Sequence, residues 1–434
     1  MQDSRFTIDR LSLGNYRRFE RFDIKLDDCL TVVIGDNGAG KTAFLDALAV
    51  AAGSVFAKIE DATSPNIAAG DAHNIVTVQG SAAVPQGQYP VSIKAEGRFE
   101  GRPIVWERSL ASKKGRTSQR GARDIVSIGE ELQKEVSAGG DRVLPVIARY
   151  SANRFAGNVP TASLVSKVIG SYVPSRTRGY AGAFDAVVNE GRTLTWLRNM
   201  TIWELQEGKV SPELSCVKRA IASSLDGVAG LAVESVRFDM QRQDVMVSYV
   251  DSSGASRIDV IGAMSEGYRS AMLMFADIAR RMAQLNPQLL DRATEAPGVV
   301  MVDEIDLHLH PRWQEHIVGD LRRAFPNVQL VVTTHSPSVV SSVKRENIRV
   351  MGATSAEMPR AATYGRDVSS ITEVVMGAGA RPAAIAGMIR ECERLLDSGD
   401  YDGAGKRLAE LESLIGADDP DLVGLRTDLT LEQL

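Results

Sequence analysis

The glycine-rich segment from Gly35 to Thr42 places the strongest constraint on how this 434-residue chain can fold. Its sequence, GDNGAGKT, fits the pattern G-x-x-x-x-G-K-[ST] at every defined position. The apolar run LTVVI (30–34) precedes it and predicts a strand covered on both faces, and AFLDALAVAA (43–52) predicts a helix after it. This order of strand, loop and helix indicates a phosphate-binding loop, because glycines let successive backbone N–H groups turn toward an anion.

The loop predicts the contacts of a bound nucleotide. We expect Lys41 to reach the β- and γ-phosphates, which makes it a candidate catalytic residue, and the hydroxyl of Thr42 to ligate Mg²⁺. The predicted cofactors are therefore ATP and Mg²⁺. The residues of the loop and of the helix start that we expect to bind ATP are Gly35, Asn37, Gly38, Ala39, Gly40, Lys41, Thr42 and Ala43.

A second apolar run far downstream, VVMV (299–302), ends in Asp303 and Glu304. At a strand tip, Asp303 is expected to hold Mg²⁺, and Glu304 to orient and deprotonate the attacking water. Phosphoryl transfer needs this division of labour, since its catalysis is mostly positioning and charge neutralisation. The next predicted strand (330–333) is followed by His335, which we expect to touch the γ-phosphate and sense its loss.

These three motifs together resemble the heads of ABC-type ATPases, whose relatives include the SMC, RecF-like and overcoming-lysogeny families. The resemblance implies an α/β fold, a P-loop ATPase head with a mixed sheet, flanking helices and an antiparallel β subdomain. It also implies a signature motif that completes the site of a second subunit. The segment MSEGYRS (264–270) resembles that motif but departs from LSGGQ, and Ser265, Glu266 and Gly267 are the residues expected to act in trans.

Other positions depart from the ABC pattern. His310 stands where many ABC heads have Asp, and no Gln follows the strand at 143–150, so Asn153 or Arg154 is the candidate for the Q-loop. His308 and His310 also suggest a metal pair. We favour the nucleotide interpretation, because the pair lacks carboxylate or Cys ligands at a metal-site spacing.

The segment Asn15 to Phe19 (NYRRF) resembles the stretch beside the adenine and phosphates in RecF-like heads. The resemblance makes Arg17, or Tyr16, a candidate ATP contact. A strand edge at the surface is a nearly equal alternative.

Composition and charge are unevenly distributed along the chain. The formal net charge is −5, which excludes a protein that binds nucleic acid by bulk charge, and the last fifty residues hold twelve acidic and five basic residues.

We expect four parts: an N-terminal part of the ATPase core (1–156), a mainly helical insertion ending in a β-hairpin (157–260), the C-terminal part of the core (261–350) and an extension with an acidic helical tail (351–434).

The tail narrows the resemblance. YGRDVSSI (364–371), Met376-Gly377 and Arg381-Pro382 before the acidic helices look like the PtuA-like ATPase subunits of Septu-type anti-phage defence, which are similar to retron-associated ATPases. This implies an ATPase that dimerises around ATP and regulates an HNH-type nuclease partner. The residues after Ser336 are expected to be helical, so we place nuclease activity in the partner. A RecF- or SMC-like DNA-repair ATPase without such a partner is the alternative.

One local segment is basic. Residues 102–123 hold seven Lys and Arg against the single acid Glu107, in a stretch rich in Ser and Gly. A solvated hairpin loop is slightly favoured as its interpretation, and a DNA-binding loop is the other. The candidate DNA contacts are Lys113, Lys114, Arg116 and Arg120.

The cysteines and the hydropathy suggest a compartment. Cys29, Cys216 and Cys392 form no CxxC pair, which suits a reducing compartment and predicts neither a disulfide framework nor a zinc site. The N-terminus has no secretory pattern, and no apolar stretch reaches the ~20 residues that a bilayer needs. We therefore expect a cytoplasmic protein that makes no membrane contact.

Overall fold

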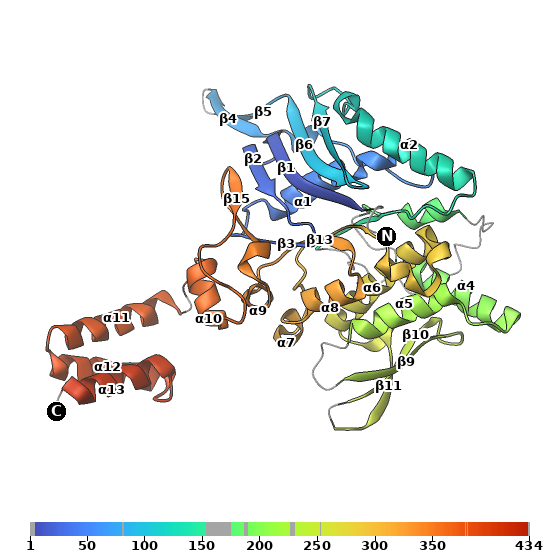
Figure 1. Ribbon diagram of the computed structural model, residues 1–434. Helices are drawn as coiled ribbons and strands as arrows, with labels where there is room; N and C mark the ends of the chain where they lie inside the picture. The colour runs from blue at the N-terminus through green and yellow to red at the C-terminus, as the bar shows by residue number, and fades with distance from the viewer. Residues whose placement is uncertain are drawn as a thin grey trace. The chain divides into compact units, whose positions relative to one another are not determined.

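Figure 1 shows the computed structural model of the chain, in which the chain divides into two units, residues 1–366 and 367–434. The structure describes residues 5–79, 82–152, 175–185, 190–225, 231–251, 253–377, 379 and 381–432. The Q-loop candidates Asn153 and Arg154 lie outside the described residues.

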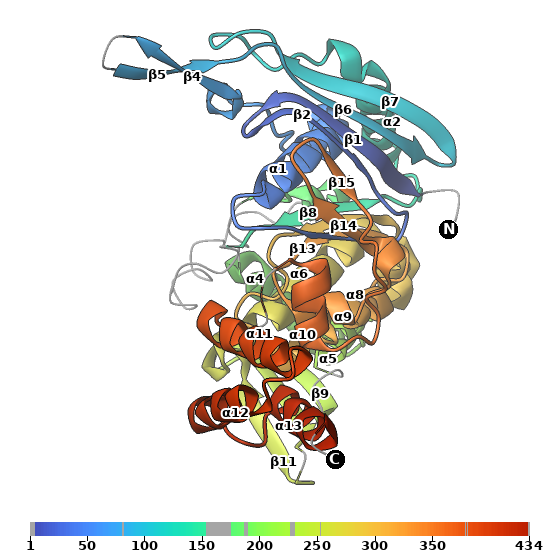
Figure 2. The ribbon, with the colours of Figure 1, turned by 90° about the vertical axis from the view of Figure 1, so that its left-hand side faces the viewer.

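A ten-stranded mixed sheet forms the framework of unit 1, with its strands in the order β7-β6-β1-β2-β15-β14-β3-β13-β12-β8. The strands are β1 (Phe6–Tyr16), β2 (Phe19–Lys25), β3 (Leu30–Ile34), β6 (Val91–Phe99), β7 (Arg102–Leu110), β8 (Val146–Tyr150), β12 (Gly298–Val302), β13 (Val328–Thr333), β14 (Ile348–Met351) and β15 (Ser355–Glu357). A separate pair, β4 (Asn74–Gln79) and β5 (Ala82–Gly87), forms an antiparallel ribbon, which projects at the upper left of Figure 2.

The two halves of the large sheet differ in strand direction. From β14 through β3, β13 and β12 to β8, all neighbours are parallel, and β3, β12 and β13 are buried along their whole length. From β7 through β6 and β1 to β2, the neighbours are antiparallel. Strands buried on both faces must be continuously apolar, which is why LTVVI was readable from the sequence. The expected α/β class with an antiparallel part is confirmed.

Helices pack around this sheet in unit 1. They are α1 (Lys41–Ala52), α2 (Arg123–Ser137), α4 (Glu190–Glu207), α5 (Pro212–Ser223), α6 (Glu266–Leu285), α7 (Pro311–Gln314), α8 (Ile317–Ala324) and α9 (Pro337–Ser341). Proline occupies the first turn of α5, α7 and α9, where its missing N–H breaks no helical hydrogen bond. No helix in the described part of the chain is long and apolar enough to span a bilayer.

The region after α4 and α5 ends in a small sheet of its own. Strands β9 (Ala232–Asp239), β10 (Asp244–Val250) and β11 (Ser256–Val260) are antiparallel, in the order β11-β10-β9. Figure 2 shows them well apart from the ten-stranded sheet. The sequence predicts a hairpin at the end of this region. In the structure β10 and β11 form a hairpin, and β9 pairs with β10 as a third strand.

A buried charge cluster joins α6 to β8 and α4. Asp277, which is 1% exposed, accepts hydrogen bonds from Arg280 (2.5 Å) and Arg281 (2.7 Å). The hydroxyls of Tyr150 (2.8 Å) and Thr193 (3.0 Å) donate to the same carboxylate. Burial disfavours the charged carboxylate, but the two arginines outweigh it and hold the pKa of Asp277 well below its usual range. The cluster fixes α6 against the strand that flanks β12.

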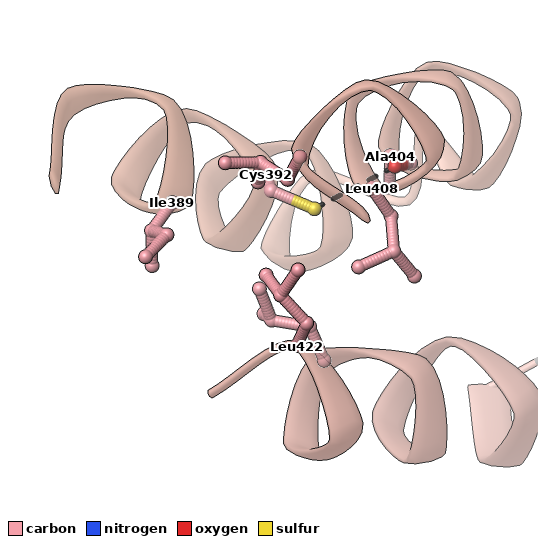
Figure 3. Packing of buried hydrophobic residues seen from close by; sticks show 7 residues of the cluster. Ile389, Cys392, Ala404, Leu408 and Leu422 are labelled. Atoms are coloured by element: carbon pink, nitrogen blue, oxygen red, sulfur yellow. Dashed lines mark hydrogen bonds between the residues drawn. The ribbon is translucent and has the colours of Figure 1, made fainter. Parts of the chain in front are cut away.

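Unit 2 has its own small core. Its helices are α10 (Val368–Ser370), α11 (Ala383–Asp397), α12 (Tyr401–Ile415) and α13 (Pro420–Glu432). The buried side chains of α11, α12 and α13 point toward one another, as Figure 3 shows, and the Cys392 thiol lies 3.5 Å from the Ala404 carbonyl oxygen. The core residues are Ile389, Cys392, Ala404, Leu408, Leu411, Leu422 and Leu425.

Replacing the central carboxylate of the charge cluster tests how much the cluster contributes to the stability of unit 1. The Asp277→Asn variant leaves Arg280 and Arg281 buried without a counter-charge, so we expect the free energy of unfolding to fall by about 3–5 kcal/mol. Urea denaturation followed by tryptophan fluorescence measures this, because all four tryptophans lie in unit 1. In the control Asp291→Asn, the lost pair with Arg219 is at the surface, and the loss should stay below about 1 kcal/mol. Equal losses in both variants would contradict the assignment.

Candidate nucleotide site

The parallel strands bring residues from distant parts of the sequence to one edge of the sheet. Strands β3, β13 and β12 are adjacent and parallel, so their carboxyl ends lie together. The glycine-rich loop follows β3, Asp303 and Glu304 follow β12, and Thr333 ends β13. Ligand sites of α/β proteins typically form at this edge.

Asp303 is the centre of the arrangement. Its side chain is almost completely buried and accepts two hydrogen bonds, from the Thr42 hydroxyl to Oδ2 (2.8 Å) and from the Thr333 hydroxyl to Oδ1 (2.6 Å). Its backbone N–H donates to the Tyr150 carbonyl (2.8 Å). The carboxylate is thereby oriented from two sides, next to the Thr42 hydroxyl, which the sequence paired with it as a metal ligand.

The glycine-rich loop has the backbone conformation that its sequence predicts. Gly38 (φ 76°) and Gly40 (φ 99°) lie in the left-handed region, which favours glycine. A Cβ on Gly40 would also lie 2.5 Å from the Phe19 ring. The first turn of α1 contains no acidic residue, so its N–H groups and helix dipole favour an anion there. Asn37 is exposed, Ala39 is half-buried, and Ala43 is buried in the first turn of α1.

Lys41 lies at the base of the loop. Its ammonium group donates to the carbonyls of Gly35 (2.7 Å) and Asp36 (3.1 Å), and the residue is 6% exposed. Burial lowers the pKa of Lys41, although the nearby carboxylates of Asp303 and Glu304 oppose this. The lysine is therefore held beside the carboxylates that the sequence assigned to the same site.

Glu304 has an unusual backbone. Its φ is 47°, in the left-handed region where a non-glycine residue is strained by ~1–3 kcal/mol. Its backbone N–H donates to the Thr333 hydroxyl (2.8 Å), which also donates to Asp303. Thr333 thus positions both acidic residues. This role was not predicted from the sequence, although Thr333 ends the predicted strand that precedes His335.

His335 lies in a short segment that is held on both sides. The Thr334 hydroxyl donates to Asp306 (2.6 Å), and the Ser336 hydroxyl donates to Gln314 (2.7 Å) while capping α9. His335 itself is half-buried between these anchors, directly after β13. These contacts fix the histidine's backbone relative to the segment that follows Glu304.

Arg17 lies in a network of ion pairs. It donates to Asp71 (2.8 Å) and to Asp46 of α1, and Asp46 also pairs with Arg149 of β8. Burial lowers the pKa of Arg17, but the neighbouring Tyr16 and the two carboxylates outweigh it and raise the pKa overall. Arg17 thereby links the N-terminal hairpin to the helix that follows the glycine-rich loop.

The signature-like residues begin α6. Ser265 is the N-cap, makes no side-chain capping bond and is exposed, as is Glu266. Gly267 is buried, and a Cβ there would lie 2.2 Å from the His308 carbonyl oxygen, so close packing within the chain requires glycine. In the described part of the chain, no hydrogen bond or ion pair connects these three residues to the glycine-rich loop.

The two histidines after Glu304 have different partners. His308 Nε2 lies 3.7 Å from the carboxylate of Glu266, whereas His310 accepts from the Arg312 N–H (3.3 Å) as the N-cap of α7. His310 therefore performs the capping role that Asp commonly performs. Within the described residues, no group of three His, Cys, Asp or Glu side chains is arranged to hold a metal.

The basic segment is divided by burial. Arg108 is fully buried and donates to Ser54, Ser64 and Asn66, so it is not available to a phosphate, and burial lowers its pKa. The four candidate DNA contacts after β7 are exposed: Lys113, Lys114, Arg116 and Arg120. Residues 102–123 have a net charge of +6, but the buried Arg108 does not contribute to the charge of the exposed surface.

The residues present fit Mg²⁺ and a nucleoside triphosphate. The oxygen donors of Thr42 and Asp303 are the kind that Mg²⁺ prefers, and they already lie within hydrogen-bonding distance of each other. The loop offers backbone N–H groups, a helix N-terminus and one ammonium group for phosphate oxygens. Glu304 adds a carboxylate one residue beyond the metal position. The arrangement can bind a nucleotide and activate a water.

Two protein-family models match the chain. One, described as "AAA domain", matches residues 10–159, which include the glycine-rich loop. The other, described as "AAA domain, putative AbiEii toxin, Type IV TA system", matches residues 206–341, which include the signature-like segment, Asp303, Glu304 and His335. The two matches therefore contain both groups of site residues.

The curated relatives include a retron ATPase and a Septu protein. The Retron Ec83 probable ATPase of Escherichia coli is 31% identical over 223 residues, 50% of this chain and 39% of the relative. The Septu protein PtuA of Bacillus mycoides (strain KBAB4) is 36% identical over 108 residues, 24% of this chain and 14% of the relative. The matches thus span well under half the length of either relative.

Solved structures of similar shape include an SMC head bound to the C-terminal winged-helix domain of ScpA (13% identity, TM-score 0.44, 81% of this chain and 96% of that one). Another is the recombination mediator protein RecF (11% identity, TM-score 0.39, 82% and 99%). With the motifs and the strand-edge site, the curated matches show that the chain is similar to a retron probable ATPase and to the Septu protein PtuA.

Proposed function

We propose that this protein hydrolyses ATP, dimerises around it and uses the cycle to regulate a nuclease partner of the HNH type in anti-phage defence. The observation that carries the ATPase proposal is the hydrogen-bonded chain Thr42–Asp303–Thr333, which joins the glycine-rich loop to the acidic strand end. The names of the retron and Septu relatives support the defence setting.

The chain's own residues divide the chemistry among them. The loop amides and Lys41 bind the phosphates, and Thr42 and Asp303 would hold Mg²⁺, which would neutralise phosphate charge when bound. Glu304 orients a water in line with the γ-phosphorus and accepts its proton. The water oxygen then forms the new P–O bond as the bond to the ADP oxygen breaks, and His335 contacts the departing phosphate.

A second copy completes the site in this proposal. Ser265 and the uncapped start of α6 are exposed and would meet the γ-phosphate bound by another chain, with Glu266 and Gly267 beside them. Each chain alone presents two half-sites. ATP bound between two copies then holds the pair together, and its hydrolysis releases them.

An ATPase that acts on DNA without a nuclease partner is the second candidate. The observation in its favour is the exposed cluster of Lys113, Lys114, Arg116 and Arg120 after β7. Burial of Arg108 removes one charge from that segment, so the basic surface is smaller than its sequence indicates. Binding to DNA through this loop would weaken steeply with salt.

Two substitutions in the site separate binding from hydrolysis. Glu304→Gln removes the base but keeps the side-chain size, so we expect ATP binding to persist while steady-state hydrolysis falls by about 100-fold or more. Lys41→Ala removes the ammonium group and should weaken ATP binding itself. Equilibrium binding of a fluorescent ATP analogue and phosphate release measure the two steps. A Glu304→Gln protein that hydrolyses ATP normally would refute the assignment.

The hydroxyl of Thr333 provides a test of positioning. Thr333→Val removes the hydrogen bonds to Asp303 and to the Glu304 amide, so we expect phosphate release to slow by roughly 10- to 100-fold. Thr333→Ser retains the hydroxyl and is the matched control, expected to stay within about threefold of the parent rate. If both variants behave alike, the hydroxyl does not position the acids.

A further inference from the structure

Unit 2 contains a surface groove of about 620 Å³ beside its small core. The end of α11, the start of α12 and the second half of α13 line it. Its apolar lining includes Leu425, which is nearly buried, and Leu431, which is 64% exposed.

The rim of the groove carries charge of one sign. Glu393, Asp397, Asp428 and Glu432 line it, and the lining includes no Lys, Arg or His. In the described part of unit 2, these four carboxylates accept one side-chain hydrogen bond, from the Tyr401 hydroxyl to Glu432 (3.3 Å). Four carboxylates in a groove that leucines also line create a negative potential that a cationic partner would relieve.

Three other acidic residues of unit 2 provide a contrast. Asp419 pairs with Arg381 (2.8 Å), Glu391 pairs with Arg407 and Glu412 pairs with Arg426. Those pairs connect the segments around the core, so each of these three carboxylates has a cationic partner within unit 2. The carboxylates at the groove have no such internal role, although they share the same short helices.

We propose that this groove docks a basic amphipathic helix of a partner protein, with apolar side chains on the floor beside Leu425 and Leu431 and Lys or Arg side chains against the acidic rim. The chain's own exposed basic loop (111–117, ASKKGRT) does not suit the groove, since it has no large apolar side chain to place there. The proposal goes beyond ATP hydrolysis and supplies the protein-binding surface that a partner-coupled ATPase needs.

A direct test uses the full-length protein and a fluorescein-labelled peptide of about fifteen residues, with Leu at helical i, i+3, i+4 and i+7 spacing and Lys elsewhere. We expect saturable binding that weakens with salt. The charge reversal Asp397→Lys/Asp428→Lys and, separately, Leu431→Asp should each weaken it by about tenfold or more. The same peptide with Glu in place of Lys should not bind.

Matched controls remove acidic or apolar groups outside the groove. Asp402→Lys/Asp418→Lys carries the same charge change as the double groove variant, and Leu414→Asp replaces a leucine that is 59% exposed elsewhere in unit 2. Both should bind the peptide within about twofold of the parent. Unchanged melting temperature and ATP-analogue binding verify that the variants are folded.

Three outcomes would overturn the proposal. Controls that weaken binding as much as the groove variants would indicate nonspecific charge attraction. Equal binding of the Glu peptide would exclude a role for the acidic rim. Self-association of the parent protein that is lost in Leu431→Asp would assign the groove to a second copy of the chain. Because the readout is peptide affinity, a failed ATPase proposal does not affect the result.

Discussion

The site depends on the Asp303 carboxylate. It accepts one hydrogen bond from the hydroxyl of Thr42, in the helix after β3, and another from the hydroxyl of Thr333, at the end of β13. These three groups are separated by up to about 290 residues in sequence and become neighbours only because β3, β13 and β12 are adjacent and parallel. The buried apolar strands therefore do more than stabilise unit 1. They set the relative positions of the proposed metal ligands and of the proposed catalytic base.

The same framework links this edge to the start of α6. Tyr150 accepts the Asp303 N–H through its carbonyl, and its hydroxyl donates to Asp277 in the middle of α6. The buried cluster around Asp277 resists displacement, because its charges are stable only while they face each other. A path of direct contacts thus runs from the acidic strand end to the helix that carries Ser265.

The local part of this picture was readable from the sequence. LTVVI, GDNGAGKT and the apolar run before Asp303 are short segments whose structure follows from their own composition, and all three occur as predicted. The roles of Thr333, the burial of Arg108 and the insertion of β14 and β15 between β2 and β3 were not readable, since each depends on which distant segments pair. A threonine or arginine looks the same in sequence whether it faces solvent or a buried carboxylate.

The central claim is that two copies complete each nucleotide site. Mixing two inactive proteins tests it most directly: Lys41→Ala, which loses the phosphate loop's ammonium group, and Ser265→Arg, which blocks the start of α6. In a mixed dimer, one of the two composite sites carries both defects and the other carries neither. We expect ATP hydrolysis, which is absent in each protein alone, to return on mixing. A mixture that remains inactive while forming dimers would contradict it.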